Sequence, residues 1–105
     1  MGEIDSVIYP LPRFKICAVL KARGAVEKSL RREMKFSALR KELGVSDPTL
    51  SKHLGVLEKA GYVDRFREYG ATRAKDTVWV TLNARGLAAF DSHIAALREL
   101  AGEEL

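Results

Sequence analysis

The side chains that most often carry chemistry are few in this sequence, and they lie apart from one another. There are two histidines, His53 and His93, and one cysteine, Cys17. They fall in three different segments, with no spacing that would bring them to one reacting atom. The sequence has no glycine-rich phosphate loop, no nucleophile elbow and no His-Glu-x-x-His pattern. We therefore expect a protein that is not an enzyme and that holds no cofactor.

Basic side chains point to a different kind of chemistry, because they are concentrated in one part of the chain. The 105 residues carry 18 Lys and Arg against 14 Asp and Glu, a net charge of +4. Residues 1–75 hold 16 basic and 9 acidic side chains, whereas residues 76–105 hold 2 basic and 5 acidic ones. A basic body with an acidic tail indicates one surface for a polyanion and a separate surface for another partner.

The spacing of apolar residues predicts the elements that would position these charges. We expect an extended lead-in over residues 1–12 and a mostly buried helix over 13–22 that stops at Gly24. Residues 25–33 are interpreted as a helical turn or as an extension of that helix. Residues 34–36 could form a very short strand.

A helix-turn-helix is expected at about residues 37–60, with Ser37 as the cap of its first helix and Gly44 as the stop. Leu50, Leu54 and Leu57 mark the buried face of its second helix. The second helix of such a pair can lie in the DNA major groove. The residues of this helix that would contact DNA are Ser46, Asp47, Thr49, Ser51, Lys52, His53 and Lys59.

A hairpin and a long last helix should follow. Alternating strands over about 62–82 flank a polar tip and form the hairpin, whose basic side chains would contact DNA; these are Arg65, Arg67, Arg73 and Lys75. Asn83 would cap a helix over about 84–101, where apolar residues follow coiled-coil spacing. That predicted dimer seam consists of Leu87, Phe90, Ile94, Leu97 and Ala101. The expected fold class is mainly α with a small β-hairpin, an α+β fold in a single domain over residues 1–105.

Three stretches of the sequence resemble a known family. They are the helix, turn and cap of residues 36–46, the Ser-x-His-Leu of 51–54, and the Leu-Glu-x-Ala-Gly-Tyr of 57–62. They resemble the winged-helix transcriptional regulators of the MarR and ArsR type, most closely the small stand-alone winged-helix DNA-binding family. Residues 77–86 look like that family's strand-to-helix junction, with Asn83 where Thr is usual.

This resemblance implies a homodimer that binds a pseudo-palindromic operator in double-stranded DNA, usually to repress transcription. The last helix, with the first, would form the dimer interface, and the two recognition helices would meet major grooves about 34 Å apart. The longest apolar run, 16–20, is far too short to span a bilayer. Glu3 and Asp5 do not suit a signal peptide, and a single cysteine fits a reducing compartment, so we expect a cytoplasmic protein.

A metal-sensing role is the first alternative that the resemblance raises. Zinc sensors of this type pair an Asp-x-His with a His-x-x-Glu on the last helix. Asp91 and His93 match the first half, but Glu104 alone stands at the place of the second half. Two ligands per chain fall short of a closed site, so we expect no bound metal.

Four single residues also need an interpretation. His53 could pack against the core or contact a phosphate or base, and Asp47 could cap its helix or accept a hydrogen bond from a cytosine amine. We expect Cys17 to be a small core residue and Trp79 to pack against a neighbouring element.

The main rival function is a winged helix that binds proteins without reading DNA. The basic hairpin tip argues against it, since a protein-binding module has no need for Arg67, Arg73 and Lys75 together. A small-molecule effector is compatible with DNA binding, and its pocket would lie between the dimer helices and the DNA-binding core.

Overall fold

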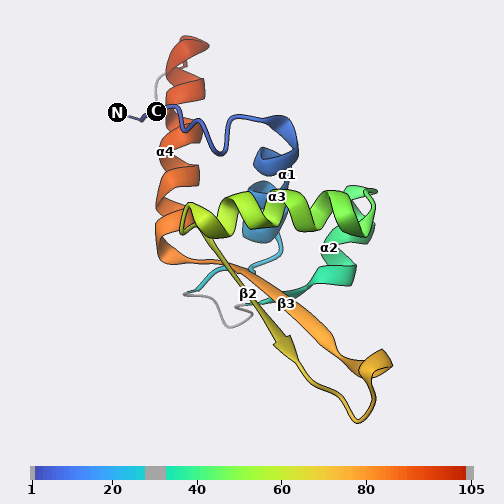
Figure 1. Cartoon of the computed structure of the whole chain (residues 1–105). Helices are drawn as coiled ribbons and strands as arrows, with labels where there is room; N and C mark the ends of the chain where they lie inside the picture. Colours follow the sequence, from blue (N-terminus) through green and yellow to red (C-terminus); the bar gives the residue numbers. More distant parts are fainter. Residues whose placement is uncertain (1, 28–32, 104–105) are drawn as a thin grey trace.

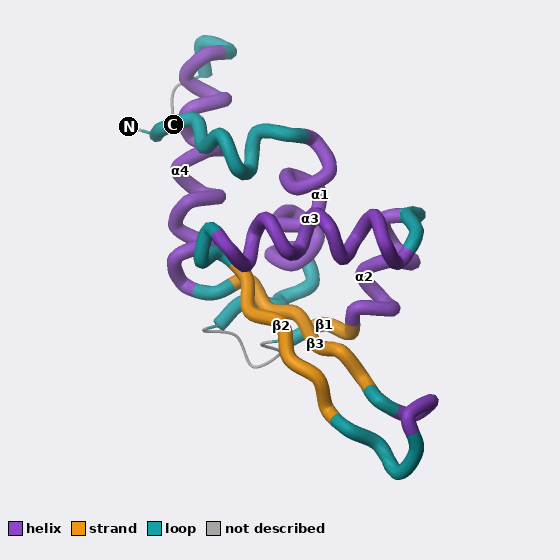
Figure 2. Tube along the Cα trace, viewed as in Figure 1, coloured by secondary structure: helices purple, strands orange, loops and turns teal. Residues whose placement is uncertain are grey.

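The computed structural model of the chain describes residues 2–27 and 33–103, and its elements are drawn in Figures 1 and 2. In chain order they are α1 (Leu11–Ala22), β1 (Met34–Lys35), α2 (Phe36–Leu43), α3 (Asp47–Lys59), β2 (Val63–Glu68), the 3-10 turn η1 (Arg73–Lys75), β3 (Thr77–Leu82) and α4 (Ala84–Leu100). The three strands form an antiparallel sheet in the order β1-β3-β2. The arrangement is a winged helix, and the expected α+β class is confirmed.

Local signals produce the α2–α3 pair. Gly44 ends α2 in the left-handed conformation, with φ of 66°, which favours glycine. Ser46 caps α3, and its Oγ accepts a hydrogen bond from the Thr49 amide at 3.3 Å. Leu50, Leu54 and Leu57 are almost fully buried, so the predicted inner face of α3 is confirmed.

Two predicted helix starts are wrong. α2 begins at Phe36, with Lys35 as its N-cap, so Ser37 is already helical and caps nothing. The chain passes straight from β1 into α2, which leaves no extended residue at position 37. α1 begins at Leu11, because Pro12 occupies the first turn, where its missing N–H does no harm. The lead-in is thus shorter than expected, and it is partly buried, since Ile8 has 0% of its surface exposed.

Residues 25–27 run beside β3 and are not helical, so the interpretation of 25–33 as a helical turn or a helix extension is wrong for these three residues. Gly24, with φ of 72°, ends α1 and turns the chain. The Leu82 amide then donates to the Ala25 carbonyl at 2.8 Å, and the Glu27 amide donates to the Leu82 carbonyl at 3.1 Å. Residues 28–32 lie outside the described part of the chain.

The core lies between α1, α3 and the sheet, with α4 packed along its side (Figures 1 and 2). Asn83 caps α4 as predicted, its Oδ1 accepting from the Gly86 amide at 2.9 Å. Gly86 has no room for a side chain, because a Cβ there would overlap the Tyr62 carbonyl. No helix in the described residues is both long and apolar enough to cross a membrane.

Phe90, which the sequence placed in the dimer seam, belongs to the core of its own chain. Only 5% of its surface is exposed, and its ring centroid lies 5.4 Å from that of Phe14 on α1. Leu87 and Ile94 are half-buried and pack against the same core. Part of the predicted seam therefore packs against its own chain. Among the seam residues Ala101 is exposed, and Leu87, Ile94 and Leu97 are half-buried.

Candidate nucleic-acid interface

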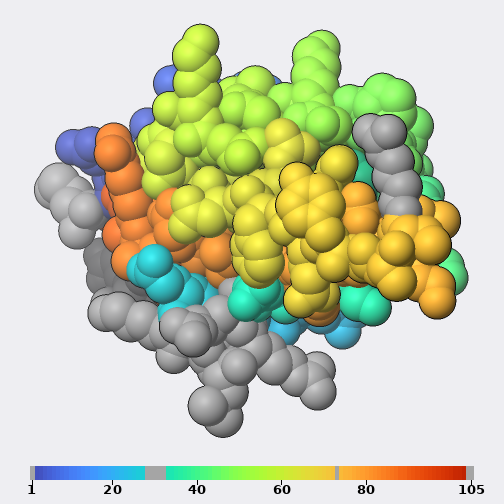
Figure 3. Space-filling model, turned by 60° about the horizontal axis from the view of Figure 1, so that its bottom comes forward, coloured from blue at the N-terminus to red at the C-terminus, as the bar shows by residue number. Residues whose placement is uncertain are grey.

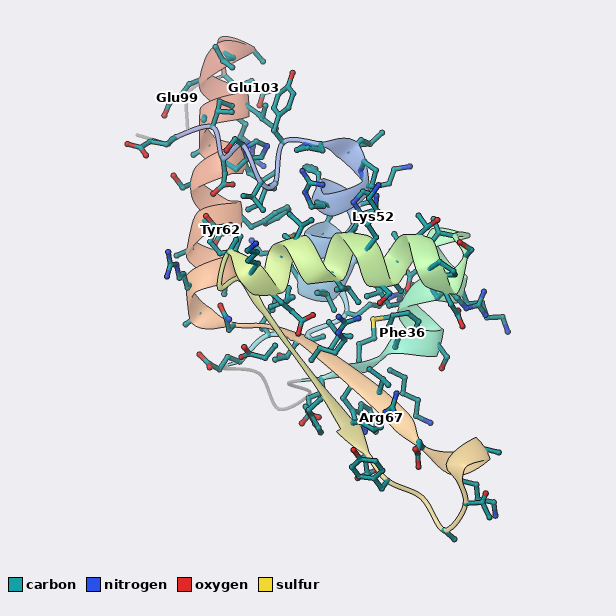
Figure 4. All side chains as sticks on the ribbon, in the orientation of Figure 1. Phe36, Lys52, Tyr62, Arg67, Glu99 and Glu103 are labelled. Carbon is teal, nitrogen blue, oxygen red and sulfur yellow. The ribbon has the colours of Figure 1, made fainter. Side chains whose placement is uncertain are left out.

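The outer face of α3 carries the polar side chains that the sequence predicted to contact DNA. Lys52 projects from α3 into solvent (Figure 4). His53 is half-buried. The exposed members of the set are Ser46, Asp47, Thr49, Ser51, Lys52 and Lys59. The cap at Ser46 and the leucine stripe orient this face, since they determine where α3 starts and which side it buries.

Asp47 does not cap the helix, contrary to one of our two hypotheses. Ser46 holds that place, and the Asp47 carboxylate forms an ion pair with Arg40 of α2, with Nε and Oδ1 2.9 Å apart. Asp47 is thus a bridge across the turn of the helix-turn-helix. Arg40 is a residue that sequence reasoning missed, although its position one turn before Gly44 places it close to the start of α3.

The wing presents arginines on one side of its hairpin. Arg65 pairs in register with Val80 and Arg67 with Val78, so both arginines lie on the sheet face that turns toward α3. Lys75 is exposed in η1 near the tip. The Asp76 carboxylate accepts from the Gly70 amide at 2.9 Å and closes the tip. Arg73 also lies in η1, but its side chain is outside the described part of the structure.

A groove joins two members of each set, Asp47 and Ser51 of α3 with Arg65 and Arg67 of the wing. Its open volume of about 670 Å³ lies between the start of α2, the first half of α3 and the wing. In Figure 3, α3 and the hairpin adjoin on one face of the molecule, and in Figure 4 Arg67 lies between α3 and the wing tip. The groove is lined by Phe36, Asp47, Pro48, Ser51, Arg65, Phe66, Arg67 and Val78.

His53 stands at the edge of this surface and packs toward α1. Arg13 Nη1 lies 3.3 Å from its Nδ1, so Nδ1 accepts and the ring is neutral. Burial lowers the pKa of His53, and the positive charges of Arg13 and Lys52 lower it further. The structure therefore agrees with the interpretation that His53 packs partly against the core. A contact between His53 and DNA stays a prediction.

The sequence profile of the family described as winged helix DNA-binding domain matches residues 13–101. The chain belongs to the winged helix DNA-binding domain family.

Solved structures of several transcriptional regulators have the same fold as this chain. A transcriptional regulator homologue from Pyrococcus horikoshii OT3 is 20% identical, with a TM-score of 0.77 over 91% of this chain and 85% of that one. The ytfH protein of Salmonella typhimurium, a candidate transcriptional regulator, is 24% identical, with a TM-score of 0.66 over 90% and 76%. MosR of M. tuberculosis, a transcriptional regulator solved in complex with DNA, is 24% identical, with a TM-score of 0.59 over 85% and 56%. No curated protein gave a significant sequence match.

The fold places Asp91 and His93, the two residues that match the zinc-sensor motif, in different surroundings. His93 is 1% exposed, and its Nδ1 accepts from the Asp5 amide at 3.0 Å. Asp91 lies on the surface and pairs with Lys21 Nζ at 2.6 Å. Glu104 lies outside the described residues, and within the described part no three His, Cys, Asp or Glu side chains converge.

Cys17 is a core residue, as expected. It is fully buried on α1, and burial raises the pKa of its thiol to about 12, with the charge of Asp5 adding to the effect. A thiol that stays protonated at neutral pH is a poor nucleophile.

A small cavity lies between α1, the end of α2 and the first half of α3. Its volume is about 140 Å³, and its walls are mostly apolar. It is lined by Leu11, Pro12, Lys15, Ile16, Leu43, Val45, Thr49, Leu50 and His53.

Proposed function

We propose that this winged helix is a cytoplasmic, sequence-specific transcriptional regulator that binds double-stranded DNA. It would act as a homodimer on a pseudo-palindromic operator and would repress transcription. One observation carries the proposal: the polar outer face of α3 and the arginine-bearing face of the wing border one open groove.

The geometry suits the two parts of a DNA site. The N-terminal half of α3 offers short hydroxyl side chains, Thr49 and Ser51, which can reach base edges in the major groove. Lys52 and Lys59 on the same helix, with Arg67 and Lys75 on the wing, suit the phosphate backbone. The proposal thus divides the surface into a base-reading helix and a backbone-holding wing.

Salt-dependent binding tests this function directly. Labelled duplexes from fragmented genomic DNA are titrated with protein, and anisotropy is followed across a salt series. A dimer that uses both wings and both helices should give a log–log slope of roughly 5 or steeper, since each neutralised phosphate contributes about 0.9.

Charge-removal variants localise the binding surface. Lys52→Gln and Arg67→Gln should each weaken binding and reduce the slope by about 0.9 for every phosphate that is no longer neutralised. Arg85→Gln is the matched control, because Arg85 is exposed in the first turn of α4 and does not line the groove. An equally large effect in the control, or no duplex binding even at low salt, would contradict the proposal.

The protein-binding alternative has one observation in its favour. Phe66 and Tyr69 on the wing are 47% and 78% exposed, and exposed aromatic side chains are common at protein interfaces. Phe66→Ser with Tyr69→Ser should leave the salt slope unchanged if the wing holds DNA through its cations.

A further inference from the structure

Arg65 is placed differently from the other basic residues of the wing. Its Nη2 lies 2.6 Å from Glu58 Oε1, and its Nη1 donates to Ser51 Oγ at 3.1 Å. Its side chain is only 25% exposed. Both partners belong to α3, so this one guanidinium joins the wing to the recognition helix.

The periodicity of the two elements explains this arrangement. Ser51 and Glu58 are seven residues apart, which is two helical turns, and they therefore share one side of α3. Side chains on a helix lean toward its N-terminus, so Glu58 reaches back toward Ser51. Arg65 lies on the face of β2 that turns toward α3, and its guanidinium fits between the two.

We propose that Arg65 is a positioning residue that locks β2 onto α3 through Glu58 and orients the Ser51 hydroxyl for DNA. The inference rests on the proposed DNA-binding function and goes beyond it, because the sequence alone predicted that Arg65 contacts DNA directly. We call Arg65, Glu58 and Ser51 together the Arg65 bridge.

Charge neutralisation supports this role. Glu58 already pairs with the guanidinium at 2.6 Å, so Arg65 adds little net positive charge for a phosphate. Arg67, two residues along the same strand, remains on the groove side and exposed. In the wing, Arg65 thus binds side chains of α3, whereas Arg67 would contact the DNA backbone.

The hydrogen bond to Ser51 has a consequence for recognition. A serine hydroxyl has one proton to donate and two lone pairs to accept with. Because Arg65 donates to Ser51 Oγ, one lone pair is occupied and the proton is left to be donated elsewhere. Ser51 lines the groove, so it would present a donor to an acceptor such as a purine N7 or a phosphate oxygen.

Glu58→Gln separates positioning from direct contact, because the two roles predict effects of opposite sign. If Arg65 only attracted phosphates, removing the Glu58 charge would free its cation and tighten duplex binding. If Arg65 is a positioning residue, Glu58→Gln should weaken binding about tenfold, as expected when one charge-assisted hydrogen bond is removed, with an unchanged salt slope. Glu68→Gln, the same change at an exposed residue of β2, is the control and should not weaken binding.

A charge-swapped double variant provides a rescue. Glu58→Arg combined with Arg65→Glu keeps the net charge and rebuilds an ion pair at the same place, and the new carboxylate can accept from Ser51. We expect the double variant to bind more tightly than either single reversal, because the ion pair between β2 and α3 is rebuilt. It should still bind more weakly than the parent protein, because the carboxylate at position 65 takes the Ser51 proton. A double variant no better than the single ones would overturn the proposal.

A measurement without DNA keeps the bridge testable if the proposed function fails. Amide hydrogen exchange of residues 63–68 is compared in the parent, Glu58→Gln and Glu68→Gln proteins, with thermal unfolding as the check on folding. The bridge predicts faster exchange of β2 in Glu58→Gln only. Parent protein that binds no duplex would refute the proposed function, whereas unchanged exchange in Glu58→Gln would refute the bridge itself.

Discussion

At the residue scale, Asp5 connects three parts of the molecule that are distant in sequence. Its Oδ1 accepts from the amides of Val7 at 2.8 Å and Ile8 at 3.1 Å, and the Tyr62 hydroxyl donates to its other oxygen. Its own amide donates to His93 Nδ1 at 3.0 Å. The N-terminal segment is therefore held both to α4 and to the short link between α3 and β2.

The pKa of Asp5 reflects this network. Burial raises the pKa, but the hydrogen bonds from Tyr62, Ile8 and Val7 outweigh burial and bring it below its usual value of 3.8. The charged form is therefore favoured in the folded protein. Its contribution to stability is present above the unfolded-state pKa and is lost as pH falls through the folded-state pKa.

Asp5→Asn should reveal that contribution. We expect the variant to be less stable than the parent at neutral pH, because the charge that receives three hydrogen bonds is gone. The difference should shrink as pH falls from about 4 through the lowered pKa of Asp5 in the folded protein, because Asp5 of the parent then also becomes neutral. Urea unfolding between acidic and neutral pH measures it, and a difference that does not change with pH would contradict this role of Asp5.

At the element scale, Gly55 lowers the stability of α3, and no contact within the described chain requires a glycine at this position. It lies on the same outer face as Lys52 and Lys59, and a Cβ built there would meet nothing within 4 Å. Glycine inside a helix costs about 1 kcal/mol relative to alanine. Close approach of a DNA backbone to α3 would explain why a residue without a side chain stands there.

Gly55→Ala should therefore change stability and binding in opposite directions. We expect thermal unfolding to show a gain of about 0.5–1 kcal/mol, and anisotropy to show weaker duplex binding. Gly55→Leu extends the series, and its larger side chain should weaken binding further. Duplex binding that is indifferent to side-chain size at this position would place the DNA elsewhere.

Elements were predictable where the signals are local. The glycine stop of α2, the serine cap of α3 and the asparagine cap of α4 each act within a few residues, and all three are confirmed. The predictions at Ser37 and over residues 25–27 are wrong, because β1 leads directly into α2 and the end of β3 binds residues 25–27. The strand that binds residues 25–27 is far along the chain, so no local pattern marks it.

At the scale of the whole molecule, exposed apolar side chains stand both on the N-terminal segment and on the C-terminal half of α4. The Gly2 amide donates to Glu99 at 3.0 Å and the Glu3 amide to Ser92 at 3.0 Å, so the segment lies along the C-terminal half of α4. Leu100 is 77% exposed on that helix, and Ile4 is 43% exposed on the segment. We propose that a second copy covers this surface.

Leu97→Asp with Leu100→Asp should then give a monomer. Light scattering of the parent protein should yield twice the chain mass of 11.7 kDa, and the double variant should yield a single chain mass. The variant should also lose more affinity for a duplex with two half-sites than for one half-site, since only the dimer gains from linking two sites. Tyr69→Asp, on the wing, is the control and should remain a dimer; a parent protein of single mass would refute the homodimer.

The sequence by itself determined the order of the helices and strands, the inner leucine face of α3, and the placing of lysines on α3 and of arginines on the wing. Those properties follow from spacing, capping and charge within short segments. Only the tertiary structure decided that Phe90 faces its own core and that Arg65 is bound by Ser51 and Glu58. Such packing depends on how separate elements come together, and the pattern within one element does not specify its partner.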